Sequence, residues 1–294
     1  MTAASPALDA ELIRFEGPGT GGLAAWVAGQ GPALVLVHSV NAAASAAEVR
    51  PLFERYRGTR TVFAIDLPGF GASERSDRTY TPRLMTDALH ALMPQVRSRC
   101  GAAPADALAV SLGCEFLARA AAEAPGAFGR LALVSPTGFA GRRERRGPPG
   151  STYAMPGMLR ALRGPGWGGA VFRGLTKPAV IRYFLRRTWG ARQIDERLWE
   201  DDVQLARAPG AEYAPLHFLS GFLFSADIRN VYDALAQPVW VAHGVRGDFT
   251  DYRGLEAMKS RFNWQVQVFP TGALPYFEQP SAFGAALDAF LARR

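Results

Sequence analysis

Cysteine and histidine are scarce in this chain, with two and four copies among 294 residues. Cys100 and Cys114 do not suggest a disulfide framework. No two histidines stand at the spacing of metal ligands, and no cysteine–histidine cluster is present, so we predict no metal site. A glycine-rich phosphate loop of the nucleotide-binding kind is also missing. We therefore predict that the protein works without a cofactor.

Long apolar runs are missing as well. No run approaches the roughly 18 residues needed to cross a bilayer, so we expect no integral membrane segment. Residues 1–12 lack a charged region followed by an apolar stretch, which argues against a signal peptide. We expect a soluble, cytoplasmic protein.

The charge is strongly basic but not concentrated. The net charge is +7, with arginine as the dominant base, and no motif for docking on nucleic acid is visible. We predict no nucleic-acid partner. Residues 167–189 interleave aromatic and basic side chains, which suits an anionic membrane surface or a lipid-like substrate. We favour an ordinary amphipathic helix with a solvated basic face.

Patterns of buried strands and helices alternate through the first half of the chain. A glycine-rich turn joins two short strands, 13–16 and 23–28, into a hairpin. Continuous apolar strands then alternate with helices, which predicts right-handed crossovers and a parallel sheet. The strands are expected at 32–38, 61–66, 106–110 and 131–136, and the helices at 47–56, 81–97 and 113–123.

The alternation stops after residue 137. Residues 138–225 contain helical stretches but no strand pattern, with helices expected at 157–162, 178–188, 195–206 and 213–224. Strands return at 239–243 and 266–270, before a last helix at 281–292. We predict an α/β core formed by residues 1–137 and 226–294, with a helical cap inserted at 138–225.

The most informative stretch is the junction of a strand and a helix at residues 106–116. Ser111 stands there with Ala109 two residues before it and Gly113 two residues after it. A serine at a sharp strand-to-helix turn needs small neighbours at these spacings because strand and helix approach closely. The helix that follows also directs its positive end toward charge that develops near Ser111.

The order of motifs makes this junction specific. A strand ends in His38-Ser39, another ends in a Pro/Gly loop at 66–73, the Ser111 turn follows, and a later strand ends in His243-Gly244 ahead of Asp248. The chain resembles the α/β-hydrolase fold family, in its capped esterase, lipase and dehalogenase-like branch, over essentially its full length. The resemblance implies a mostly parallel central sheet flanked by helices, with an inserted helical cap.

The resemblance also implies a set of catalytic positions. Ser111 matches the nucleophile and Asp248 the acid of a serine–histidine–acid triad, with Asp251 as a nearby alternative acid. The backbone N–H groups of Val40 and Leu112 match the oxyanion hole.

The chain departs from the family pattern at the position of the triad histidine. The loop at 270–280 fits the family pattern and puts Ala273 where the base is expected, and alanine cannot accept a proton. Ser39 replaces the usual glycine, which is a milder change. Among the other histidines we favour His217, in the predicted cap helix, as a substitute base, with His243 as the second choice.

Several other residues have both a structural and a functional interpretation. We expect His38 and His90 to be structural. Asn41 is a candidate for hydrogen bonding to a substrate, although turn asparagines are common for backbone reasons. Tyr276 is adjacent to the missing base and is a candidate proton donor or substrate contact, although packing is its more common role.

Two functions follow from these residues. The first is a cofactor-independent hydrolase that acts through Ser111 on an ester or related acyl bond of a hydrophobic small molecule. The second is a non-hydrolytic member of the fold, a ligand-binding protein or a lyase, isomerase or cyclase, which the loss of the histidine favours because losing one triad member costs several powers of ten in rate. A pure interaction scaffold is a third possibility, but no feature of the sequence supports it.

Overall fold

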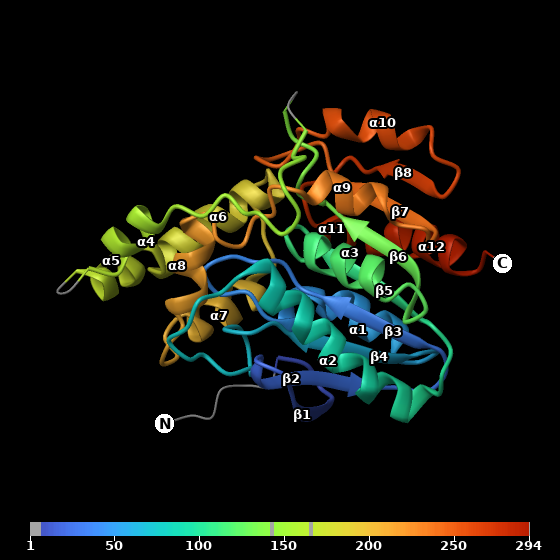
Figure 1. The fold of residues 1–294 in the computed structure, drawn as a ribbon, viewed down its shortest axis with the longest axis horizontal. Coiled ribbons are helices and arrows are strands. Elements are labelled where there is room, and N and C mark those ends of the chain that lie inside the picture. The colour runs from blue at the N-terminus through green and yellow to red at the C-terminus, as the bar shows by residue number, and fades with distance from the viewer. Residues whose placement is uncertain (1–6, 142–143, 165–166, 294) are drawn as a thin grey trace.

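The central element is a twisted sheet that runs through the whole molecule (Figure 1). A computed structural model describes residues 7–141, 144–164 and 167–293. In these residues the strands lie in the order β1-β2-β4-β3-β5-β6-β7-β8, with β1 and β2 antiparallel to their neighbours and all other pairs parallel. The strands are β1 (Glu11–Gly17), β2 (Gly21–Ala28), β3 (Ala33–Val37), β4 (Thr61–Asp66), β5 (Ala105–Val110), β6 (Phe128–Val134), β7 (Val239–His243) and β8 (Trp264–Val268). The predicted α/β fold with a mostly parallel sheet is confirmed.

Helices cover both faces of the sheet and bury its inner strands. Alternate residues of β3 show this, because Val35 packs into one apolar core and Leu36 into the other. The first core is closed by α2 (Pro82–Cys100), α3 (Gly113–Glu123) and α9 (Ile228–Asp233). The second is closed by the 3-10 helix η1 (Ala46–Val49), α1 (Arg50–Tyr56), α11 (Pro275–Glu278) and α12 (Pro280–Leu291).

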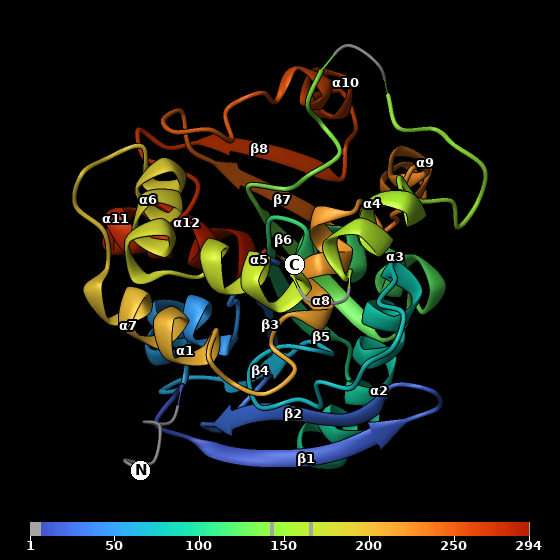
Figure 2. The same ribbon diagram turned by 90° about the vertical axis from the view of Figure 1, so that its left-hand side faces the viewer.

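Five helices between β6 and α9 gather beyond the carboxyl ends of the strands. Figure 2 looks onto this end of the molecule and shows them in front of the sheet. They are α4 (Pro156–Leu162), α5 (Gly168–Leu175), α6 (Pro178–Trp189), α7 (Glu196–Leu205) and α8 (Tyr213–Leu219). All five fall inside the interval predicted to form a cap. The short elements η2 (Arg253–Leu255) and α10 (Glu256–Lys259) lie between β7 and β8.

Local sequence explains where several helices begin and end. Thr81 caps α2 by accepting a hydrogen bond from the Leu84 N–H at 3.2 Å, and Pro82 occupies the first turn, as predicted. The helix predicted at 213–224 ends at Leu219 instead. Gly221 follows with a φ of 77°, a left-handed conformation that a continuing helix does not contain. The last strand lies two residues earlier than predicted, at Trp264–Val268.

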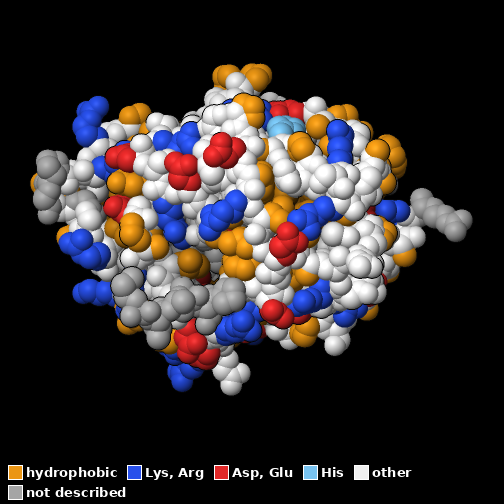
Figure 3. Space-filling view, turned by 90° about the horizontal axis from the view of Figure 1, so that it is seen from below, with side chains coloured by type: hydrophobic (Ala, Val, Ile, Leu, Met, Phe, Trp, Pro, Cys, Tyr) orange, Lys and Arg blue, Asp and Glu red, His pale blue; other side chains and the backbone are white. Residues whose placement is uncertain are grey.

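The surface mixes charges of both signs. On the face seen in Figure 3, Lys and Arg side chains alternate with Asp and Glu, and hydrophobic side chains gather in hollows between them. Many of the arginines form ion pairs with carboxylates nearby in space. Among the described residues, no helix combines the length and apolar character required to cross a membrane.

Candidate active site

Ser111 occupies a strained turn between β5 and α3. Its φ is 52°, an unusual conformation for a residue with a side chain, and its N–H donates to the Val134 carbonyl at 2.8 Å. Gly113 is required at the start of α3, because a Cβ atom there would come within 2.4 Å of the His38 carbonyl oxygen. The predicted small residue after the serine therefore has a direct steric reason.

Ser111 opens into a cavity of about 330 Å³ under helices α5 to α8. The wall is mainly apolar, with side chains such as Phe172, Ile181 and Phe218. Its polar members are Ser39, Asn41, Glu48, Ser111, Ser135, Arg187, Thr188, Asp202 and Asp248. An apolar cavity with a few convergent polar groups is the usual form of a small-molecule site.

Two backbone N–H groups beside Ser111 have no acceptor among the described residues. They belong to Val40, which lines the cavity, and Leu112, which follows Ser111. Both residues are at least 95% buried, at 5% and 1% exposure. Buried N–H groups are nearly always hydrogen-bonded, so a pair without acceptors is suited to a ligand oxygen.

Asp248 also lines the cavity, but its carboxylate already has an ion-pair partner. Its carboxylate forms an ion pair with the Arg187 guanidinium of α6, and its N–H donates to the Arg187 carbonyl at 3.2 Å. The hydrogen bond to Asp248 raises the pKa of Arg187. The alternative acid, Asp251, lies outside the lining, where hydrogen bonds from Arg253 and the Gly141 N–H hold its pKa well below the usual range.

Ala273 lies in the cavity wall next to these groups. Its N–H donates to the Thr188 carbonyl at 2.9 Å, and its carbonyl accepts from the Ser135 hydroxyl at 2.7 Å. The loop is thus held between α6 and the end of β6. All four histidines are within the described residues, and none of them lines the cavity.

His217 does not line the cavity into which Ser111 opens. Its ring is 1% exposed and lies edge-on to Tyr80 and Phe222, with centroid separations of 5.4 and 5.2 Å. Its Nδ1 donates to the Tyr213 carbonyl at 2.7 Å, which leaves it as a packing residue of α8. Burial lowers the pKa of His217.

The remaining histidines are also held by local contacts. His243 stacks on Tyr252 with centroids 4.0 Å apart, and its Nδ1 bonds the Gly244 carbonyl at 2.9 Å. His38 accepts a hydrogen bond from the Leu67 N–H at Nε2, at 3.0 Å, and burial lowers its pKa. His90 bonds Glu123 at 2.9 Å, away from the cavity.

The two predicted substrate contacts differ in position. Asn41 lines the cavity, where its Oδ1 accepts from the Ala43 N–H at 2.7 Å and so stabilises the turn. Tyr276 is 1% exposed and lies behind the wall, with its hydroxyl donating to the Glu48 carbonyl at 3.1 Å. Asn41 therefore has access to a ligand, whereas Tyr276 supports η1.

Two buried acids in the cavity wall were not predicted. Glu48 of η1 accepts hydrogen bonds from the Ser39 N–H at 2.5 Å and the Ser39 hydroxyl at 2.7 Å, and burial raises its pKa. Asp202 of α7 is 4% exposed, and burial next to Glu48 raises its pKa well above the usual range. Neither position has a sequence motif, because Glu48 lies in a short 3-10 helix that is buried throughout and Asp202 lies on the inner face of an otherwise ordinary amphipathic helix.

Comparisons with known proteins identify the family and the fold. A model of the alpha/beta hydrolase family matches residues 34–286. Pimeloyl-[acyl-carrier protein] methyl ester esterase of Xylella fastidiosa (strain 9a5c) is 34% identical over 118 residues, which are 40% of this chain and 42% of the relative. The chain thus matches less than half the length of that esterase.

Solved structures show the same fold over nearly the whole chain. A meta-cleavage product hydrolase of Pseudomonas fluorescens IP01 aligns with a TM-score of 0.71 and 15% identity, covering 95% of this chain and 97% of the other. A thermophilic esterase from Thermogutta terrifontis aligns with a TM-score of 0.71 and 19% identity, covering 96% and 98%. These alignments show the fold, and the family match over residues 34–286 shows that the chain belongs to the alpha/beta hydrolase family.

Proposed function

We propose that this protein is a hydrolase of carboxylic esters that uses Ser111 as its nucleophile. The observation that carries the proposal is the strained turn at Ser111, with a φ of 52°, beside two buried N–H groups that have no acceptor among the described residues. Strain at a turn and unpaired buried donors both carry a cost, and they occur together where an oxyanion forms. The partial match to an esterase agrees with this chemistry.

The reaction proceeds by acyl transfer. The ester carbonyl oxygen binds between the N–H groups of Val40 and Leu112, the Ser111 oxygen attacks the carbonyl carbon, and the alcohol leaves with a proton. Water then hydrolyses the acyl-enzyme and restores the Ser111 hydroxyl. Since no histidine lines the cavity, the Ser111 proton passes to water, and catalysis depends mainly on the oxyanion hole and on binding.

This site predicts a slow enzyme. An oxyanion hole and substrate binding alone give on the order of 10³- to 10⁴-fold acceleration over water, far below an intact triad. The mainly apolar wall of the 330 Å³ cavity favours a hydrophobic small molecule.

A second function is favoured by a separate observation. Ala273 replaces the base, and Arg187 occupies the Asp248 carboxylate that would orient a histidine. Both features suit a protein that binds an apolar ligand without forming an acyl-enzyme.

Covalent labelling distinguishes the two functions. We expect a fluorophosphonate to add once to the wild type, slowly, and not at all to Ser111→Ala, as measured by intact mass. His217→Ala should label at the wild-type rate, because His217 is buried between two aromatic rings. The wild type and His217→Ala should hydrolyse p-nitrophenyl butyrate at the same slow rate, and Ser111→Ala should not hydrolyse it. Absence of labelling and turnover in the wild type would favour the ligand-binding function.

A further inference from the structure

Two acids of the cavity wall have no role in the proposed hydrolysis. Glu48 comes from η1 and Asp202 from α7, and both line the same cavity as Ser111. They are 6% and 4% exposed, so each carboxyl is removed from bulk water. Buried acids are rare unless they are paired, so each of these two carboxyls is expected to have a hydrogen-bond or ion-pair partner.

Glu48 has protein partners, whereas Asp202 does not. Both Glu48 oxygens accept hydrogen bonds from Ser39. The carboxyl of Asp202 has no hydrogen bond and no ion pair within residues 7–141, 144–164 and 167–293. Arg50, the cation whose charge acts on Asp202, pairs with Asp201 through Nη2 and donates to the Ala7 carbonyl through Nε. Asp202 is thus a buried polar side chain at the cavity wall without a partner.

The charges that face the cavity are unbalanced. The lining contains three acids, Glu48, Asp202 and Asp248, and one base, Arg187. Arg187 pairs with Asp248, and Arg50 at the end of η1 pairs with Asp201, so no further base among the lining residues faces Glu48 and Asp202. Burying a charged carboxylate is unfavourable. Protonation removes the charge, and a cationic ligand offsets the unfavourable burial by forming an ion pair.

We propose that the cavity binds ligands with an apolar body and a protonated amine, and that the ammonium group lies between Asp202 and Glu48. An ammonium group offers three N–H donors, enough for both carboxylates, and charge-assisted hydrogen bonds are about twice as strong as neutral ones. The apolar lining, including Ile181 and Leu185, accommodates the hydrocarbon part. The assignment names the substrate class of the proposed hydrolase and so rests on that function: an ester with an amine on its acyl or alcohol side.

Direct binding tests the assignment without turnover. We compare n-hexylamine, which is protonated at pH 7, with n-hexanol of the same length, by calorimetry on Ser111→Ala and the wild type. Ion pairs with buried carboxylates predict that the amine binds at least about tenfold more tightly. Asp202→Asn should abolish this preference, and Glu48→Gln should reduce it.

The control variant is Glu200→Gln, which removes the same charge from an exposed position of the same helix. It should keep the preference for the amine. Equal affinity for the two probes in the wild type, or a preference that survives Asp202→Asn, would overturn the assignment. If Asp202→Asn does not fold, as judged by circular dichroism, Asp202→Ser and Glu48→Gln provide the same comparison.

A second pair of probes separates this inference from the proposed function. The wild type should hydrolyse the p-nitrophenyl ester of 6-aminohexanoate faster than that of hexanoate, and Asp202→Asn should treat them alike. Ser111-dependent hydrolysis without a preference would contradict the amine site alone. Tight amine binding with no Ser111-dependent hydrolysis of either ester would contradict the hydrolase alone.

Discussion

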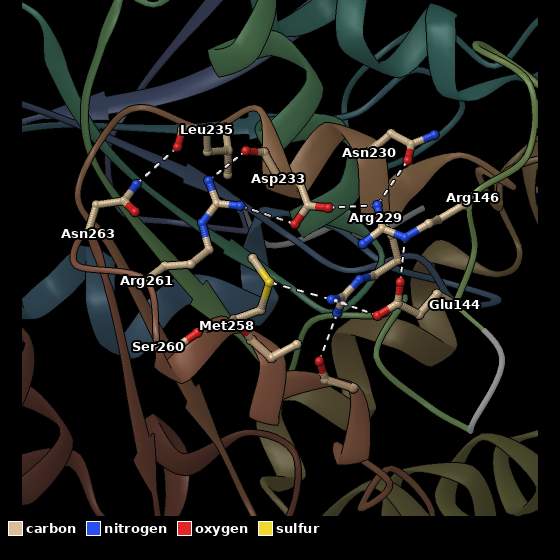
Figure 4. Close-up of polar contacts among 12 residues, drawn as sticks. Glu144, Arg146, Arg229, Asn230, Asp233, Leu235, Met258, Ser260, Arg261 and Asn263 are labelled. Carbon is tan, nitrogen blue, oxygen red and sulfur yellow. Dashed lines mark hydrogen bonds and ion pairs between the residues drawn. The ribbon is translucent and has the colours of Figure 1, made fainter.

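Ionisable side chains are buried in two regions of this molecule, and only one region supplies them with protein partners. Figure 4 shows the first, around Arg229 of α9. This guanidinium is 1% exposed, donates to the Gly254 carbonyl at 2.9 Å, approaches Glu144 at 3.4 Å and lies over the Phe139 ring at 4.8 Å. Only its Nε lacks a partner among the described residues. The second region is the cavity wall at Asp202, whose carboxyl has no such partners.

The surroundings of Arg229 extend the same pattern. Arg146 pairs with Asp233 at 2.7 Å, Arg261 reaches the same carboxylate at 3.2 Å, and the Asn263 amide donates to the Leu235 carbonyl at 3.0 Å (Figure 4). These contacts join the chain before α4 to α9 and to the turn that precedes β8. A buried charge with nearly complete partners is explained by the fold, whereas a buried carboxyl without them is suited to a ligand of opposite charge.

The largest stability effect is expected where the buried charge is paired. Arg229→Ala removes a hydrogen bond, a cation–π contact and a large buried side chain, and should lower the free energy of unfolding by about 2–4 kcal/mol. Arg146→Ala, at a half-exposed position, should cost less than about 1 kcal/mol. Urea unfolding measures both. A loss at Arg229 no larger than that at Arg146 would remove the contrast between the two regions.

The pair of Arg187 and Asp248 is an intermediate case, because it is partly exposed and includes the residue proposed as the catalytic acid. Ala273→His alone should raise esterase turnover little, since Arg187 occupies the carboxylate that a histidine needs. Combined with Arg187→Ala, the same substitution should raise kcat at least about tenfold, because a positioned base contributes on the order of 10²- to 10⁴-fold. The pair of single variants and the double variant are compared on p-nitrophenyl butyrate. A full gain from Ala273→His alone would show that Arg187 does not block Asp248.

At Asp202, removing the charge should stabilise the protein. Burial raises the pKa of this carboxyl in the folded state, so the folded protein holds the proton more tightly and stability falls as pH rises from about 4 toward the raised pKa. Asp202→Asn removes that penalty, and the variant should gain roughly 1 kcal/mol over the wild type at pH 7 and nothing below about pH 4. Urea unfolding at pH 4 to 7 measures the difference. A variant that is less stable at pH 7 would mean that Asp202 has a partner after all.

Some of these features are predictable from the sequence and others are not. The strands and the turn at Ser111 follow from local patterns, because periodicity and small residues act within a few positions, whereas the replacement at Ala273 follows from the resemblance to the family. The ion pair of Arg187 with Asp248 joins residues 61 positions apart and has no local signature. Asp202 likewise meets the cavity only because α7 packs against η1. Side chains brought together by the packing of distant helices are what the sequence alone leaves open.

The smallest effect is expected at His217, which the sequence favoured as a base. Burial lowers its pKa, so the unfolded chain binds the proton more tightly and stability is lost as pH falls below about 6.5. His217→Gln should remove that loss, a change of about 1 kcal/mol or less between pH 7 and 5.5, while the rate of fluorophosphonate labelling at Ser111 stays the same. Urea unfolding and intact mass measure the two. A fall in labelling would mean that His217 reaches the cavity in another conformation, and the buried ring between Tyr80 and Phe222 would then belong with Asp202 among groups that the ligand engages rather than with Arg229.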